Sequence, residues 1–522
     1  MKLLTLISII LTTVSAHSSL WLSMTFITSI FAQSQLIDTP SFLSISGLNT
    51  PTQVIYDKTT GLIFISEKGG AIKAVSNAFK TIPESTIAYH LTTLSVDTDG
   101  QHGLTSIAIN GSYLYALYHA SNTTNPTCIS NGVIPSGKTA KDVYGCVTRV
   151  ILSRFPIISN ITSYIGYSLG TEFLLLNSAA NAATSNMSFV PSHCSQFGFS
   201  GANHMLFNDI NKDLLISVGV GANEDGLESD IGQYGGDPCG IPNGKVNSSG
   251  FLRAQVLTSL MGKIISLSSS SIETFVNSPY SSSIPSLLLQ VKIIAIGLRN
   301  PWRMLSLNTL TSSKLVVIDP GLENFEEVND VTLSSNNNGH NIINFGFPCI
   351  QGNVFVNSFA TNDICSSPLF PFTPSSILYT HPLNRGTFSA LAYDSLRSRY
   401  ILADYSNSIV FSIPSNFSLS FSSLPLPLTS LEAETAGIII EALPAFASHI
   451  ESIQIGTMST HLLVDVVKGT IKSRNLWATP IPSSNPSATP KTTVTSGSTV
   501  VTVSLLLLTM MLSISLSTSM YV

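Results

Sequence analysis

The chain alternates short apolar runs with turn residues over most of its length. Between residue 40 and residue 476 the runs are rich in Ile, Leu, Val and Phe, are separated by Gly, Asn, Ser and Pro, and show no long helical period. Runs of this length and composition predict β-strands. Three segments repeat one form, a strand, a turn and a second strand. The predicted strand pairs lie at 61–73, 399–411 and 460–472, and single strands of similar composition lie at 113–118, 214–220 and 314–318.

The repetition of short strands predicts an all-β fold arranged radially, as in a β-propeller. A segment of roughly 430 residues is also too large for the core of a single β-sandwich. We therefore expect residues 40–476 to form one propeller domain. The Ser-rich segment 266–283 interrupts the strand pattern and is predicted to be a flexible loop.

Both ends of the chain depart from the strand pattern. Residues 1–32 are mainly apolar and offer two cleavage points, after Ala16 or after Ala32, which predicts a signal peptide, with an uncleaved anchor as the alternative. Segment 478–499 is rich in Pro, Ser and Thr and is predicted to be a stalk. Segment 500–522 is apolar and lacks charges, which favours a GPI signal over a membrane tail. These ends predict a protein at the extracellular face of the plasma membrane.

Cysteines and glycosylation sequons agree with secretion. Six cysteines are an even and sparse set without a C-x-x-C pair, which argues against structural zinc. We expect three local bridges, although other connectivities remain open: Cys128 with Cys146, Cys194 with Cys239, and Cys349 with Cys365. The sequons that predict N-glycosylation stand at Asn110, Asn122, Asn160, Asn186, Asn247 and Asn416.

Charge is low along the whole chain. Charged residues make up 10% of the sequence and the formal net charge is −5. Binding to nucleic acid relies on clustered Lys and Arg that neutralise phosphates. The composition therefore excludes nucleic acid as an expected partner.

The most informative stretch is 293–303. A short apolar strand ends at Gly297, and Arg299 and Asn300 follow it before a proline that cannot continue a sheet. A cation and an amide at a strand end suit an anionic or carbonyl-rich ligand. The alternative is a buried arginine that caps loop carbonyls, and the residues alone leave both open.

This stretch resembles the signature of the glucose/sorbosone dehydrogenase family, and further motifs resemble that family between residues 45 and 475. The resemblance implies a six-bladed β-propeller that oxidises sugars with pyrroloquinoline quinone (PQQ) and Ca²⁺; Hedgehog-interacting proteins share this fold. The motifs are Gly-Leu-Arg-Asn-Pro-Trp-Arg at 297–303, Asp-Gly-Gln-His-Gly-Leu at 99–104, Asn-His at 203–204, Leu-Met-Gly-Lys-Ile at 260–264, the segment 319–329 and Asn-Phe-Gly-Phe-Pro at 344–348.

The resemblance also implies roles for individual residues. By motif position, His204 is the general base, Arg299 and Asn300 lie beside the quinone, Gln101 contacts sugar or cofactor, and the backbone carbonyls of Gly321 and Leu322 hold the calcium. A base, a cation and a Lewis acid are what this oxidation requires. By contrast, His102 lies in a Gly-rich loop and is expected to be solvated.

Several family positions differ here. Ser406 stands where the family has a cofactor-binding lysine, His449 and Glu451 stand where it has arginines, and Val220 replaces an aspartate. Fewer cations weaken the binding of a tricarboxylate quinone. Two functions therefore remain open: a sugar dehydrogenase that oxidises an aldose hydroxyl, and a non-catalytic extracellular propeller that binds a glycan or a secreted protein.

Overall fold

The computed structural model describes residues 44–475 with internal gaps, of which the longer ones are 77–87, 122–147, 178–193, 196–200, 222–249, 278–290, 335–341, 381–386, 416–438 and 443–449. The predicted signal peptide, stalk and C-terminal anchor lie outside the described residues. Within the described ranges, no helix has both the length and the hydropathy needed to cross a membrane.

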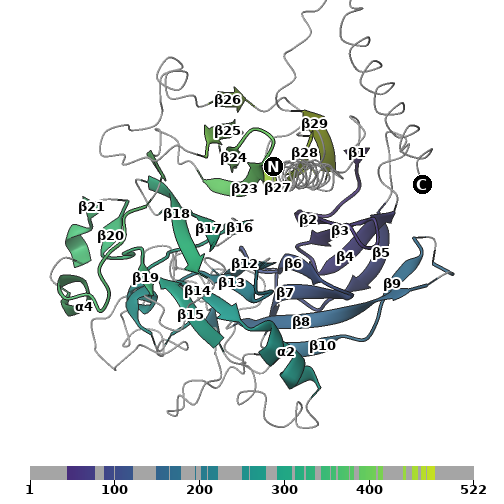
Figure 1. Cartoon of the computed structure of the whole chain (residues 1–522), viewed down its shortest axis with the longest axis horizontal. Coiled ribbons are helices and arrows are strands. Elements are labelled where there is room, and N and C mark those ends of the chain that lie inside the picture. The colour runs from purple at the N-terminus through teal and green to yellow at the C-terminus, as the bar shows by residue number, and fades with distance from the viewer. Residues whose placement is uncertain are drawn as a thin grey trace, which may run out of the picture. The chain divides into compact units, whose positions relative to one another are not determined.

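The described strands form six sheets of four or more strands and one two-stranded sheet (Figure 1). Neighbouring strands in the large sheets are antiparallel, apart from a short parallel pairing of β15 with β19. The first sheet comprises β2 (Pro51–Asp57), β3 (Leu62–Glu67), β4 (Ala71–Ser76) and β5 (Tyr89–Thr93). The second comprises β6 (Leu104–Asn110), β7 (Tyr113–Ser121), β8 (Thr148–Ser159), β9 (Tyr167–Leu169), β10 (Phe173–Asn177) and β11 (Cys194–Ser195). The third comprises β12 (Ala202–Phe207), β13 (Leu214–Val218), β14 (Lys263–Leu267), β15 (Val291–Ile296) and β19 (Ile343–Asn344).

The remaining sheets continue the same order along the chain. They comprise β16 (Arg303–Asn308), β17 (Ser312–Asp319), β18 (Phe325–Ser334) and β22 (Ile377–Thr380); β23 (Phe388–Asp394), β24 (Arg399–Asp404), β25 (Ile409–Pro414) and β26 (Ile439–Ala442); and β27 (Ile450–Ile455), β28 (Thr460–Asp465), β29 (Thr470–Asn475) and β1 (Ser44–Ile45). The predicted strand pairs are confirmed as β3–β4, β24–β25 and β28–β29.

The first strands of the large sheets contact one another in a closed order. β2 contacts β6, β6 contacts β12, β12 contacts β16, β16 contacts β23, β23 contacts β27, and β27 contacts β2. β1 precedes the first sheet in the chain but pairs with β29 in the last sheet, so that both ends of the described chain build one sheet. This closed arrangement of radially repeated sheets is a β-propeller, and the all-β prediction is confirmed.

A β-bulge recurs at the second residue of these inner strands. Thr52, Thr105, Asn203 and Ser389 are each skipped in the pairing with the following strand. Their side chains instead donate hydrogen bonds to backbone carbonyls in or just before the first strand of the next sheet, Thr52 to Leu104, Thr105 to Ala202, Asn203 to Pro301 and Ser389 to Ile450. A bulge turns a side chain away from the regular ladder. The bulged residue therefore links each of these sheets to its successor.

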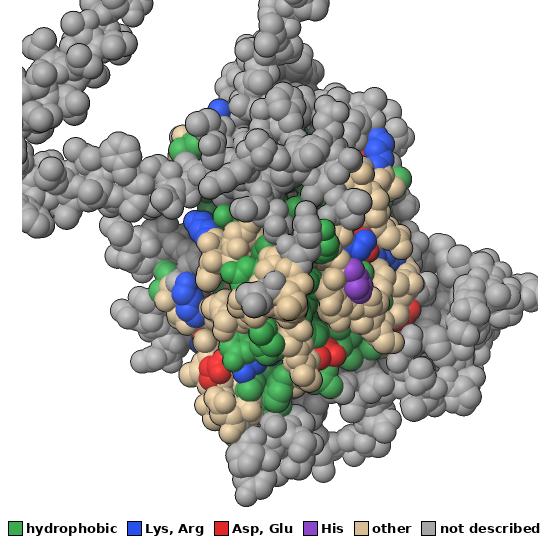
Figure 2. All heavy atoms as spheres, turned by 90° about the vertical axis from the view of Figure 1, so that its right-hand side faces the viewer, with side chains coloured by type: hydrophobic (Ala, Val, Ile, Leu, Met, Phe, Trp, Pro, Cys, Tyr) green, Lys and Arg blue, Asp and Glu red, His purple; other side chains and the backbone are tan. Residues whose placement is uncertain are grey.

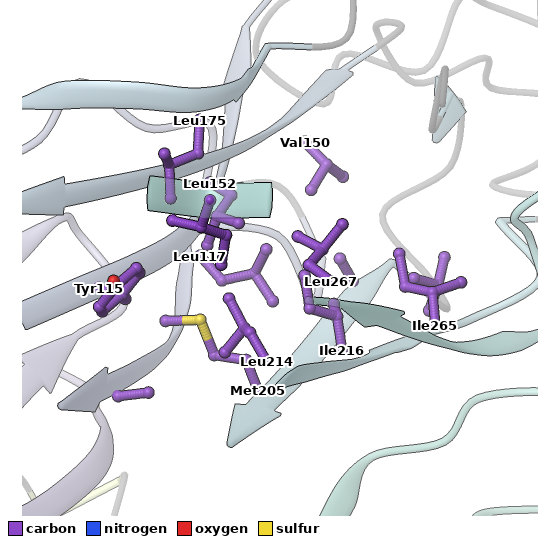
Figure 3. Close-up of a cluster of buried hydrophobic side chains, with 14 of the residues drawn as sticks. Tyr115, Leu117, Val150, Leu152, Leu175, Met205, Leu214, Ile216, Ile265 and Leu267 are labelled. Atoms are coloured by element: carbon purple, nitrogen blue, oxygen red, sulfur yellow. The ribbon is translucent and has the colours of Figure 1, made fainter. Parts of the chain in front are cut away.

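Apolar side chains pack between neighbouring sheets. The largest cluster joins β7, β8 and β10 to β12, β13 and β14, and Figure 3 shows Leu117, Met205 and Leu214 within it. Each of these three side chains is at most 1% exposed. Alternating apolar residues on successive strands produce this packing, because side chains two apart share one face.

Part of the Ser-rich segment 266–283 is a helix, so the loop prediction was wrong there. Helix α2 (Ser269–Val276) is capped by the preceding Ser268, whose side chain accepts the N–H of Ser271 at 3.0 Å. Serine at this position caps free N–H groups at a helix start. Ile272 and Phe275 are buried in the core cluster and hold the helix against the sheets.

A lobe outside the large sheets carries the described disulfide. It contains β20 (Ile350–Gln351), β21 (Val354–Phe355), η4 (Asn357–Phe359) and α4 (Asp363–Ser366), and the predicted bridge Cys349–Cys365 is confirmed. A further short helix, η3 (Gly250–Gln255), precedes β14. On the face in Figure 2, charged side chains are scattered and do not gather into one patch.

Candidate functional site

The loop after β15 brings Arg299 and Asn300 to a fixed position. Gly297 has a φ of +72°, and a Cβ there would lie 2.4 Å from Asn344 Oδ1 and 2.6 Å from Gly346 N. Glycine is required at such a turn, where positive φ and close approach coincide. Its N–H donates to Ala254 O in η3, and its carbonyl accepts the N–H of Phe347.

Lys263 holds η3 in place beneath this turn. Its side chain is fully buried, and Nζ donates to the carbonyls of Arg253, Ala254 and Met261 at 2.9, 2.7 and 2.7 Å. Burial lowers the pKa of Lys263 well below its usual range. The Leu-Met-Gly-Lys-Ile motif therefore supports the Gly297 turn from behind.

Asp319, at the end of β17, anchors the loop from the other side. Its carboxylate accepts the backbone N–H of Arg299 at 2.9 Å and that of Asn300 at 2.6 Å. Burial raises the pKa of Asp319 to about 6, although these two N–H donors and the charge of Arg299 act in the opposite direction. Glu327 is its partner in the β17–β18 register, and burial, followed by the charge of Asp319, raises the pKa of Glu327 to about 8.

Arg299 binds the chain's own carbonyls. Its Nη1 donates to the carbonyls of Pro320 at 3.1 Å and Gly321 at 2.9 Å. Gly321 is the residue whose carbonyl the resemblance assigns to calcium, and Leu322 lies outside the described residues. The arginine thus caps loop carbonyls, which was one of the two interpretations left open by the sequence.

Three amide side chains meet beside Arg299. Asn300 Nδ2 donates to Gln101 Oε1 at 3.3 Å, and Asn203 Nδ2 donates to Asn300 Oδ1 at 2.7 Å. Asn203 and Asn300 are buried, whereas Gln101 is half-buried. We call Gln101, Asn203 and Asn300 the amide cluster. Asn203 Oδ1 is buried and accepts no hydrogen bond from any described residue, which is uncommon for a buried polar atom.

His204 lies among the inner strands, next to the bulge at Asn203. Its Nδ1 accepts the N–H of Met304 at 3.2 Å, and its Nε2 lies 3.2 Å from Gln53 Nε2. Burial, followed by the charge of Arg303, lowers the pKa of His204 well below its usual range. None of the hydrogen bonds described for its ring reaches Arg299 or Asn300. Its role as a general base stays a prediction.

A pair of buried histidines connects Gln101 to the strand of Asn203, and no pattern in the sequence indicated it. His119 Nε2 accepts the N–H of Ala202 at 3.2 Å, and its Nδ1 lies 3.4 Å from the carbonyl of Gly103. His102 stacks on it with a centroid distance of 4.5 Å and contacts Asp97. The expectation that His102 is solvated was wrong, because it is 1% exposed.

The other predicted residues fall in three groups. Asn110 and Asn160 are half-buried, and Ser406 is exposed. Only the backbone of Cys194 and Glu451 is described. Residues that lie outside the described ones are Cys128, Cys146, Cys239, Asn122, Asn186, Asn247, Asn416 and His449.

The described residues do not fit PQQ and Ca²⁺ in the arrangement that the resemblance implies. The carbonyls of Pro320 and Gly321 already accept hydrogen bonds from Arg299. Ser406 bonds to Thr387 and adds no charge for a tricarboxylate. Within the described ranges, no three His, Cys, Asp or Glu side chains are grouped so that they could hold a metal ion.

No protein-family model and no curated protein match this chain. Solved structures do match, at low identity. A glucose dehydrogenase-type oxidoreductase from Thermus thermophilus is 14% identical, with a TM-score of 0.47 and coverage of 83% of this chain and 99% of that one. The PQQ-bound aldose sugar dehydrogenase of Streptomyces coelicolor is 12% identical, with a TM-score of 0.47 and coverage of 84% and 99%.

The soluble aldose sugar dehydrogenase of Escherichia coli, in its apo form, is 13% identical, with a TM-score of 0.49 and coverage of 83% of this chain and 97% of that one. Solved structures of sugar dehydrogenases are thus among those to which this chain is similar. The resemblance to Hedgehog-interacting proteins stays a prediction.

Proposed function

We propose that this protein is a sugar dehydrogenase-like propeller that binds a small carbohydrate at the amide cluster. The observation that supports this is the buried Asn203 Oδ1, an acceptor without a donor among the described residues, beside the half-buried Gln101. Amides offer donors and acceptors together, and sugar hydroxyls need both. A ligand hydroxyl would donate to Asn203 Oδ1 and displace the Gln101–Asn300 hydrogen bond, which at 3.3 Å is long.

Asn203→Thr provides a sharp test, because two other sheets already have a threonine at the equivalent bulge position, Thr52 and Thr105. The variant can keep a hydrogen bond to the next sheet but loses the amide oxygen. We expect affinity for the preferred aldose, measured by calorimetry over a sugar panel, to fall about tenfold, while the loss of the Asn203–Asn300 hydrogen bond lowers the unfolding midpoint only slightly. The matched control is Asn211→Thr at an exposed turn. Equal affinity of wild type and Asn203→Thr would refute the site.

Oxidation of an aldose hydroxyl with a quinone is the second candidate. In its favour, Gln101, Arg299 and Asn300 form one network, as the resemblance implies for residues beside the cofactor. The test is dye reduction by the purified protein with PQQ, Ca²⁺ and a panel of aldoses, repeated with Ser406→Lys to restore a cation. Sugar binding without dye reduction in either protein would leave the non-catalytic interpretation, in which a glycan or a secreted protein is the partner.

We also propose six blades, one for each large sheet, which the closed contact order of the inner strands supports. The composition of both ends supports entry into the secretory pathway and attachment through a C-terminal lipid anchor. Phosphatidylinositol-specific phospholipase C should then release the protein from cells. Retention that only detergent overcomes would favour a spanning tail.

A further inference from the structure

Two consecutive backbone carbonyls converge on one cation in this protein. The oxygens of Pro320 and Gly321 lie 3.1 and 2.9 Å from Nη1 of Arg299. The backbone there is tightly placed, since a Cβ on Gly321 would lie 1.6 Å from the carbonyl oxygen of Phe325. Carbonyl oxygens are ligands that calcium also prefers. We call the carbonyls of Pro320 and Gly321 the carbonyl pair.

The neighbouring carboxylate is already engaged. Asp319 accepts two backbone N–H groups, from Arg299 and Asn300, and its pairing in the sheet sets it opposite Glu327. Calcium takes six to eight oxygen ligands, usually with carboxylates among them. The guanidinium of Arg299 already binds both carbonyls through Nη1, and its charge would repel a second cation at the same place.

We propose that the guanidinium of Arg299 replaces a metal ion at the carbonyl pair, so that the wild-type site is independent of calcium. The positive charge is part of the chain and is present whenever the protein is folded. This inference goes beyond carbohydrate binding and does not depend on it, because it concerns which cation occupies the carbonyl pair.

The experiment measures thermal unfolding with 10 mM CaCl₂ and with EDTA, in wild type and in Arg299→Ala. Removal of the guanidinium frees the carbonyl pair for a small cation. We expect Arg299→Ala to gain about 2 °C in unfolding midpoint from Ca²⁺ beyond any shift in wild type. Arg299→Lys keeps a cation and should show no extra shift. Arg397→Ala, which removes an arginine that pairs with Asp394 at the surface, is the matched control and should behave as wild type.

Calcium bound elsewhere would shift every variant equally, so only the difference between variants counts. An equal response of wild type and Arg299→Ala, whether zero or positive, would overturn the proposal. If Arg299→Ala does not fold, Arg299→Gln takes its place, since its amide can satisfy one carbonyl and leaves the site uncharged. Failure of this test would leave carbohydrate affinity at the amide cluster unaffected, and so the two proposals are separable.

Discussion

At the scale of the residue, burial and partners decide what a side chain can do. Arg299, Asn300 and Gln101 lie in one hydrogen-bonded network near Asp319, while the His204 ring contacts Gln53 and Met304. The backbone N–H of Met304 points at Nδ1, which can accept it only while that nitrogen carries no proton. A protonated imidazole would therefore be poorly accommodated, and this agrees with the lowered pKa of His204.

The His204 environment predicts a dependence of stability on pH. The unfolded chain binds a proton at His204 below about pH 6.5, whereas the folded protein does not, so stability is lost as pH falls below that value. The loss should approach about 1.4 kcal/mol per pH unit. Urea unfolding at pH 7.5 and 5.5 should show a smaller loss in His204→Gln than in wild type. The control is His90→Gln, at an exposed site; parallel pH profiles for His204→Gln and wild type would contradict the argument.

The raised pKa of Glu327 predicts a pH dependence of stability with the opposite sign. Its folded pKa of about 8 lies above the ordinary value, so its contribution to stability is present at low pH and is lost as pH rises toward 8. Glu327→Gln stays neutral, and its amide can donate to Asn329 Oδ1, which is buried and has no hydrogen-bond partner among the described residues. Relative to wild type, Glu327→Gln should therefore become more stable between pH 5.5 and 8.5 in urea unfolding. If the stability of Glu327→Gln relative to wild type does not rise with pH, the pKa of Glu327 is not raised in the fold.

At the scale of the element, turns between strands position the site. The Gly297 turn connects β15 to Arg299 and Asn300, and η3, held by Lys263, supports it from behind. The bulges of the inner strands have a similar effect, because they turn Asn203 toward the next sheet. Short irregular segments, more than the strands themselves, set the positions of the polar groups.

Gly297→Ala should destabilise the protein by about 3 kcal/mol, since a side chain at positive φ costs about 1–2 kcal/mol and the Asn344 hydrogen bonds must also shift. Gly111→Ala isolates the backbone cost, because φ is +58° there and no described atom lies within 4 Å of the added Cβ. The free energies of unfolding in urea provide the comparison. Equal losses for both variants would mean that the close approach at Gly297 costs nothing.

At the scale of the whole molecule, closure of the ring joins segments that are far apart in sequence. β1 and β29 complete the last sheet, and Ile45 packs with Val464 and Ile471 as well as with Val54 and Ile63 of the first sheet. Loss of this contact should weaken the junction of the two ends first, since the sheets on the far side of the ring do not depend on it directly.

Ile45→Ala should lower the free energy of unfolding by about 3 kcal/mol, because Ile45 is fully buried. Hydrogen exchange should rise in β2, β3, β28 and β29 more than in β17 and β18. The control is Ile158→Ala, since Ile158 is 47% exposed and should contribute little. Exchange that rises uniformly around the ring would argue against a local junction.

The sequence by itself determined the strands and the fold class, because alternation of apolar residues and turn residues are local signals. The paired strands at 61–73, 399–411 and 460–472 and the end of β15 before Gly297 followed from these signals, and the Cys349–Cys365 bridge followed from the spacing of the two cysteines. The motifs also marked Gln101, Arg299, Asn300 and Gly321, which the fold connects in one network.

Only the tertiary structure decided the partners of these residues. Gln101 meets Asn300 across nearly two hundred positions, and such a contact depends on closure of the ring rather than on any local pattern. The strands that surround His204 are likewise distant in sequence. The carbonyls that bind Arg299 and the ring that stacks on His102 lie nearer in the chain, and the pairing of neighbouring strands brings them into place. A residue's type fixes which bonds it is able to make, but the packing of distant sheets determines which of them it makes.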